Sequence, residues 1–130
     1  MDKALADMIN EYIEKGDFTG GTSDSNIAEA ERKLEVKFPA EYKEFVRDFG
    51  SGGICGVDIL GVERSDYASV VESTERYREL GLPKRYIVVE TVDEFVYCLS
   101  TVNEYNVVRW DDVTKKESSR YSSFNNFFTR

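Results

Sequence analysis

The chain has 130 residues, of which 25 are acidic and 17 are basic, and it contains no histidine. Its formal net charge of −8 disfavours binding to nucleic acids, because contact with a phosphate backbone requires a basic surface. The lack of histidine excludes Ser-His-Asp and Cys-His catalytic systems and every histidine metal site. Any catalysis would therefore depend on carboxylates, lysine, tyrosine or a thiol.

The two cysteines, Cys55 and Cys98, lie far apart in apolar segments, and a zinc site would need more ligands than the chain offers. They are typical of small buried side chains in a reducing cytosol. The first residues lack the pattern of a signal peptide, and no apolar run is long enough to span a membrane. We therefore expect a cytoplasmic protein without cofactor or metal, forming one domain over residues 1–130.

The first half of the chain has the apolar spacing of amphipathic helices. This spacing predicts a helix over residues 5–13, closed by Gly16. A second helix is expected from Asn26, which has a glutamate three residues later as in a capping box. Pro39 suits the first turn of a third helix, whose aromatic stripe ends at Phe49.

A dense group of glycines, GSGGICG at residues 50–56, follows the third helix. A phosphate-binding loop would follow a strand and precede a helix, whereas here the order is reversed and the lysine of a P-loop is missing. A phosphate would also meet the negative end of the helix dipole. We interpret Gly50 as a helix stop in the left-handed conformation, and Gly52-Gly53 as a turn into a strand over residues 54–60.

The second half changes to the alternating pattern of strands. A fourth helix, capped by Ser65 or Asp66, is expected before them. Three strands are predicted, at residues 86–89, 95–99 and 107–110. The aromatic residues from Tyr121 onward predict a short C-terminal helix. The fold class is therefore α+β, with N-terminal helices packed on a mostly antiparallel sheet.

Acidic residues are the candidates for contact with a partner, and each has a structural alternative. Asp111 and Asp112 are either partner contacts or turn caps, and Asp66 is a partner contact or a helix cap. We expect the group around Glu90 to bracket a hairpin and project at the sheet edge, where a solvated turn is the alternative. The partner-binding candidates are Glu63, Asp66, Glu90, Asp93, Glu94, Asp111 and Asp112.

Two further groups of side chains carry open alternatives. The glutamates of the second helix, including Glu31, are interspersed with basic residues as on a solvated helix face. Aromatic residues could anchor an interface in place of the acidic ones, although Trp110 on a strand favours the core. The tyrosines in question are Tyr67, Tyr77, Tyr97 and Tyr105.

A combination of motifs connects these segments. An acidic helix carries Ile27, Glu31 and Leu34, and it is followed by FPAEYKEF at residues 38–45, by Phe49-Gly50 and by Gly52-Gly53. This combination resembles the SUKH superfamily, and the likeness extends over residues 5–128. The resemblance implies an α+β fold without shared catalytic residues. It also implies that many bacterial members are immunity proteins, which bind and neutralise the toxin domain encoded beside them.

We hypothesise an immunity protein that binds a cognate polymorphic toxin by steric and electrostatic occlusion. The acidic surface would steer it to a basic active cleft, as a nuclease would have. The alternative is an intracellular scaffold or regulator of the same fold without a toxin partner, since the eukaryotic relatives of the superfamily include a yeast regulator of cell-wall synthesis. A carboxylate-based enzyme is a third hypothesis, and no motif supports it.

Overall fold

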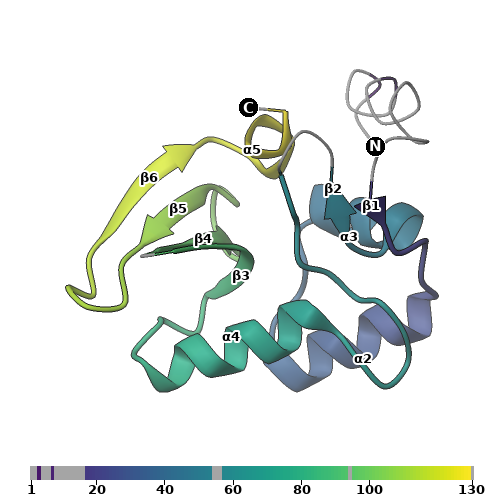
Figure 1. The fold of residues 1–130 in the computed structure, drawn as a ribbon, viewed down its shortest axis with the longest axis horizontal. Coiled ribbons are helices and arrows are strands. Elements are labelled where there is room, and N and C mark those ends of the chain that lie inside the picture. Colours follow the sequence, from purple (N-terminus) through teal and green to yellow (C-terminus); the bar gives the residue numbers. More distant parts are fainter. Residues whose placement is uncertain (1–2, 4–6, 8–16, 54–56, 94, 130) are drawn as a thin grey trace.

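A computed structural model describes residues 3, 7, 17–53, 57–93 and 95–129 of the chain. Its helices are α2 (Asp24–Leu34), α3 (Ala40–Phe49), α4 (Ser69–Glu79) and α5 (Phe124–Phe128). Its strands are β1 (Asp17–Phe18), β2 (Gly52–Gly53), β3 (Tyr86–Val92), β4 (Phe95–Ser100), β5 (Val107–Trp110) and β6 (Glu117–Tyr121). The predicted α+β class with an antiparallel sheet and a short C-terminal helix is confirmed (Figure 1). The predicted helix over residues 5–13 lies outside the described residues.

The main sheet has the order β3-β4-β5-β6, with every neighbouring pair antiparallel. Val92 lies opposite Phe95, and Trp110 lies opposite both Val96 and Glu117. The β3–β4 and β5–β6 turns therefore lie at one end of the sheet, and the β4–β5 loop, residues 101–106, lies at the other. Figure 1 shows the β5–β6 hairpin projecting at the left, away from α5.

Strands β3, β4 and β5 are the buried part of the sheet, and their side chains alternate between two cores on its two faces. Ile87, Leu99 and Val107 face the larger core, which is shared with α2, α3 and α5. Val88 and Cys98 belong to a smaller core on the other face, together with Trp110. Trp110 is 1% exposed, which confirms its expected place in the interior. Strand β6, at the edge of the sheet, stays exposed, so this strand and the turns and loops are among the surfaces available to a partner.

The helix caps predicted for the second and fourth helices, α2 and α4, are both wrong in position. The α2 helix begins at Asp24, because the Ser23 side chain is its cap and accepts a hydrogen bond from the Asn26 backbone N–H. The prediction that Ser65 or Asp66 caps α4 is wrong. The α4 cap position is occupied by Ala68, and the Glu63 carboxylate accepts from the Ser69 backbone N–H at 2.8 Å instead. A carboxylate from outside the helix thus satisfies one of its first N–H groups.

The first part of the strand predicted over residues 54–60, residues 54–56, lies outside the described residues, and the described part differs from the prediction of a turn followed by a strand. Gly52-Gly53 is itself a strand and pairs with β1, while Ile59 makes only an isolated bridge to Gly52. Residues 57–62 form a strap along the edge of β3, where the Leu60 N–H donates to the Val89 carbonyl at 2.8 Å. The positive φ predicted for Gly50 is confirmed at 76°, although its ψ of −77° lies outside the left-handed helical region.

Strand β6 was not predicted from the sequence. Its residues, ESSRY, are exposed except for the half-buried Tyr121, so they lack the apolar alternation that marks a strand. The strand forms because its backbone pairs with β5, with Ser119 opposite Val108. The opposite edge of the sheet is covered, since the Val88 N–H donates to the Thr74 hydroxyl of α4 at 2.9 Å.

Candidate functional site

Six of the seven acidic candidates are among the described residues, and they fall in three separate places. Asp93, Asp111 and Asp112 lie in the two turns at one end of the sheet. Glu63 and Asp66 precede α4, and Glu90 is on β3. Glu94 lies outside the described residues. The structure therefore brings three of the candidates to one end of the sheet and does not assemble the six described ones into one surface.

The β5–β6 turn is organised by the Asp111 carboxylate. Its Oδ1 accepts from the backbone N–H groups of Val113 at 2.8 Å and Thr114 at 3.1 Å. These hydrogen bonds hold the pKa of Asp111 below its usual value, and the bond from the Thr114 N–H lowers the pKa more than that from the Val113 N–H. The turn-capping alternative is therefore confirmed for Asp111. Lys115 and Lys116 belong to the same turn, and the Lys115 ammonium donates to the Asp112 backbone carbonyl, so this end carries charges of both signs.

Glu90 does not project at the sheet edge, which corrects the prediction. Its side chain is 6% exposed, and its Oε2 accepts from the Asp58 backbone N–H at 3.2 Å. Strand β3 continues to Val92, so Glu90 lies within the paired strand, opposite Tyr97, and not beside the hairpin turn as predicted. The carboxylate holds the strap of residues 57–62 against β3.

Glu63 and Asp66 differ in what their carboxylates contact. Glu63 binds Ser69 twice, through the backbone N–H and through the hydroxyl at 2.5 Å, so its first role is to fix the start of α4. Asp66 is exposed and pairs with Arg64 at 2.8 Å. An exposed ion pair of this kind adds little stability, and the Asp66 carboxylate remains at the surface.

Glu31 is buried, whereas the charge pattern predicted a solvated helix face. The side chain is 5% exposed, and its Oε2 accepts from the Phe38 backbone N–H at 2.7 Å. The sequence carries a signal for this position, because Glu31 follows Ile27 by four residues and lies on the same helix face. The carboxylate ties α2 to the link that leads into α3.

Replacing Glu31 with alanine is expected to lower the free energy of unfolding by about 1–3 kcal/mol, since the buried Phe38 N–H loses its acceptor. Urea denaturation followed by circular dichroism measures the change. Glu29→Ala on the same helix is the matched control, because Glu29 is exposed and pairs with Arg32 at the surface. An equal loss in both variants would contradict the assigned role of Glu31.

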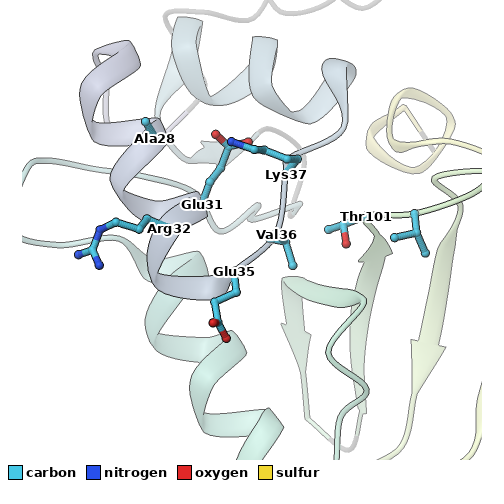
Figure 2. Close-up of a pocket in the computed structure, with 8 residues that line it drawn as sticks. Ala28, Glu31, Arg32, Glu35, Val36, Lys37 and Thr101 are labelled. Carbon is cyan, nitrogen blue, oxygen red and sulfur yellow. The ribbon is translucent and has the colours of Figure 1, made fainter.

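The opposite end of the sheet presents the 101–106 loop, with cavities around it. A cavity of about 680 Å³ lies between α2 with its following link and the start of the loop. Figure 2 shows Glu31 and Glu35 on the α2 side, with Thr101 across from them. A second cavity of about 210 Å³ lies between Tyr105 of the loop and the start of α3. The 101–106 loop is therefore bordered by a cavity on each of two sides.

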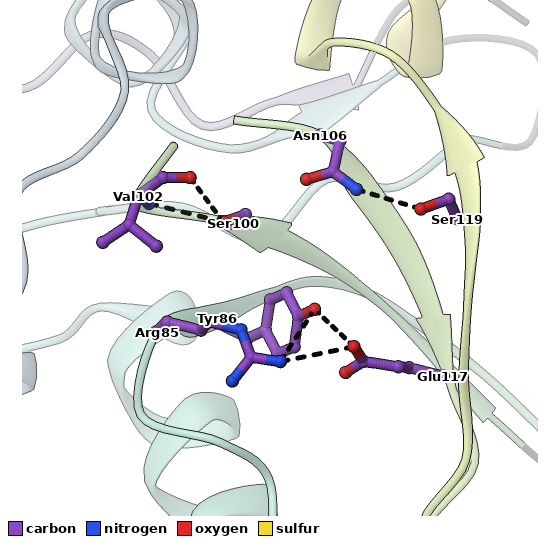
Figure 3. A network of polar contacts seen from close by, with 7 residues as sticks. All are labelled: Arg85, Tyr86, Ser100, Val102, Asn106, Glu117 and Ser119. Atoms are coloured by element: carbon purple, nitrogen blue, oxygen red, sulfur yellow. Dashed lines mark hydrogen bonds and ion pairs between the residues drawn. The ribbon is translucent and has the colours of Figure 1, made fainter. Parts of the chain in front are cut away.

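The 101–106 loop also carries exposed apolar side chains. Val102 is 41% exposed and Tyr105 is 48% exposed. The loop is held by polar contacts to the sheet, among them Ser100 Oγ donating to the Val102 carbonyl and Asn106 donating to Ser119 (Figure 3). In the sequence, Tyr105 is only one of several aromatic residues that could anchor an interface with a partner. The missed signal is two apolar residues inside an otherwise polar loop.

Among the described residues, no group of three potential ligands is placed to hold a metal ion. Cys98 is buried, and burial raises the pKa of its thiol far enough to keep it protonated at neutral pH. In the part of the chain that is described, no helix is long and apolar enough to cross a membrane.

The family that matches the chain is SUKH_5, described as SMI1-KNR4 cell-wall, and the match covers residues 4–130. Nearly the whole sequence is included, and the resemblance noted in the motifs is confirmed. The chain therefore belongs to the SUKH (SMI1-KNR4) family.

Proposed function

We propose that this protein is an immunity protein that binds a cognate toxin domain and occludes its active cleft. The observation that carries the proposal is the family match over residues 4–130, because the SUKH family is known for toxin-immunity proteins. The protein would act as a stoichiometric binder in the cytoplasm and would need no cofactor. It would occupy the cleft with its own surface loops.

The charge of the chain supports a basic partner. The net charge of −8 favours association with a cleft of opposite sign and raises the rate of encounter at low ionic strength. A nuclease has such a cleft, because its substrate is a polyanion. The proposed steering residues are the exposed Asp66 and Asp93 and the half-buried Asp112, with Glu94 as a further proposal.

A regulator or scaffold of the same fold is the second candidate function. The description of the matching family refers to the cell wall, and a relative acting there would bind a protein without neutralising a toxin. Both candidate functions depend on contacts with another protein, so the fold does not distinguish them. Protection of cells from a toxin is expected of an immunity protein and not of a regulator.

Co-expression tests the proposal. The toxin domain encoded beside this gene is expressed from one promoter and the protein from a second, and cell growth is recorded. We expect growth to be restored when both are produced in equal amounts. Cell death despite an equal supply of the folded protein would overturn the immunity function and favour the regulator.

A further inference from the structure

We propose that the 210 Å³ cavity beside the 101–106 loop receives one basic side chain of the partner, with an arginine as its best occupant. This inference rests on the proposed function for the identity of the partner. The cavity lies between the loop and the first residues of α3 and α5. Its volume is below the roughly 300–1,000 Å³ of small-molecule sites, so it suits a single side chain.

The walls of the cavity are mainly apolar. Pro39 and Ala40 line it at the start of α3, and Phe124 lines it at the start of α5. Tyr105 contributes a ring from the loop. Apolar walls of this kind match the methylene stem of an arginine or lysine, which buries its carbon atoms while its charged head contacts polar groups.

Two carboxylates give the cavity its charge preference. Glu41 lines it from the first turn of α3, where its Oε1 is held by the Asn125 backbone N–H at 3.1 Å. Glu104 lines it from the exposed loop. The N-terminal end of the α3 dipole contributes about half a positive charge, which is less than the two negative charges of the carboxylates. A cation is therefore favoured over an anion.

Tyr105 adds the geometry that distinguishes a cation from an apolar side chain. It is 48% exposed and has a φ of 54°, a left-handed conformation that is uncommon for a bulky residue. Its backbone N–H donates to the Val102 carbonyl at 3.4 Å, which closes the turn of the loop. An exposed tyrosine beside carboxylates can stack on a guanidinium, and tyrosine and arginine dominate the energetics of interfaces.

The first test uses the isolated protein and a small probe. N-acetyl-arginine methylamide is titrated while the backbone amide signals of Tyr105 and Ser123 are followed by NMR. The citrulline analogue, which has the same shape without the charge, is the control. We expect saturable shifts in the millimolar range from the arginine probe alone, with binding about fivefold weaker in Glu104→Gln. Equal shifts from both probes, or none from either, would overturn the assignment.

The second test uses the toxin domain encoded beside the gene. We expect its dissociation constant to rise at least tenfold with Glu104→Lys and with Tyr105→Ala. The control is Glu79→Lys at the exposed end of α4, which makes the same charge change at a residue outside the proposed partner contacts and should have a smaller effect. Failure of the unchanged protein to bind would overturn the proposed function. Tight binding by the unchanged protein together with unchanged affinity in Glu104→Lys would overturn the cavity assignment alone.

Discussion

Replacing Phe45 with alanine is expected to lower the free energy of unfolding by about 3–5 kcal/mol. The side chain is completely buried at the centre of an aromatic cluster. Its ring centroid lies 5.5 Å from that of Phe124, 5.3 Å from that of Phe128 and 5.8 Å from that of Phe49. Alanine would leave a cavity where α3 meets α5, and urea denaturation measures the loss.

The matched control for Phe45 is Tyr105→Ala, which removes another aromatic ring from an exposed position. A surface substitution of this kind changes the free energy of unfolding by about 0.5 kcal/mol or less. The two variants separate the core that holds the fold from the loop that we assign to the partner. A loss of less than about 1 kcal/mol in Phe45→Ala would contradict the placement of α5 against α3.

Replacing Gly61 with alanine is expected to cost about 3 kcal/mol or more. A Cβ at this position would lie 1.8 Å from the Gly50 carbonyl oxygen, far inside any van der Waals contact. Neither backbone can move freely, because the Gly50 carbonyl accepts from the Val62 N–H and the Gly61 N–H donates to the Ser69 hydroxyl. Thermal unfolding followed by circular dichroism measures the effect.

Gly20→Ala is the control for the close approach at Gly61. The space around a Gly20 Cβ is open among the described residues, so its cost comes only from a φ of 99° and is about 1–2 kcal/mol. A Gly61→Ala variant as stable as Gly20→Ala would contradict the packing of the strap against the glycine segment. A Cβ at Gly50 or Gly53 would also meet a backbone carbonyl oxygen, so these two glycines serve close backbone packing.

The parts of the fold that were predictable depend on local patterns. The stripe through Ile27 and Leu34 and the apolar strands around Val88 and Leu99 are contained in short windows of sequence, and they determine the α+β class. The C-terminal helix was predictable because aromatic residues such as Phe124 recur at helical spacing. The family motif depends on the same short segments.

The remaining features depend on contacts between distant segments. Glu90 is buried because of its hydrogen bond to Asp58, and Glu31 because of its hydrogen bond to Phe38. Strand β6 requires its pairing with β5, which no pattern in its own residues predicts. The candidate site could not be predicted either, because the strand register decides that the 101–106 loop and the acidic turns lie at opposite ends of the sheet.

The proposed function is neutralisation of a toxin by stoichiometric binding, and inhibition of the toxin by the purified protein distinguishes this function from a regulator and from an enzyme. The activity of the proposed partner, a toxin domain encoded beside the gene, is measured while this protein is added in increasing molar ratio. Occlusion predicts that the activity falls in proportion to the protein added and reaches its minimum at one equivalent. Undiminished activity at an excess of the protein, or complete loss at a small fraction of an equivalent, would contradict neutralisation by stoichiometric binding.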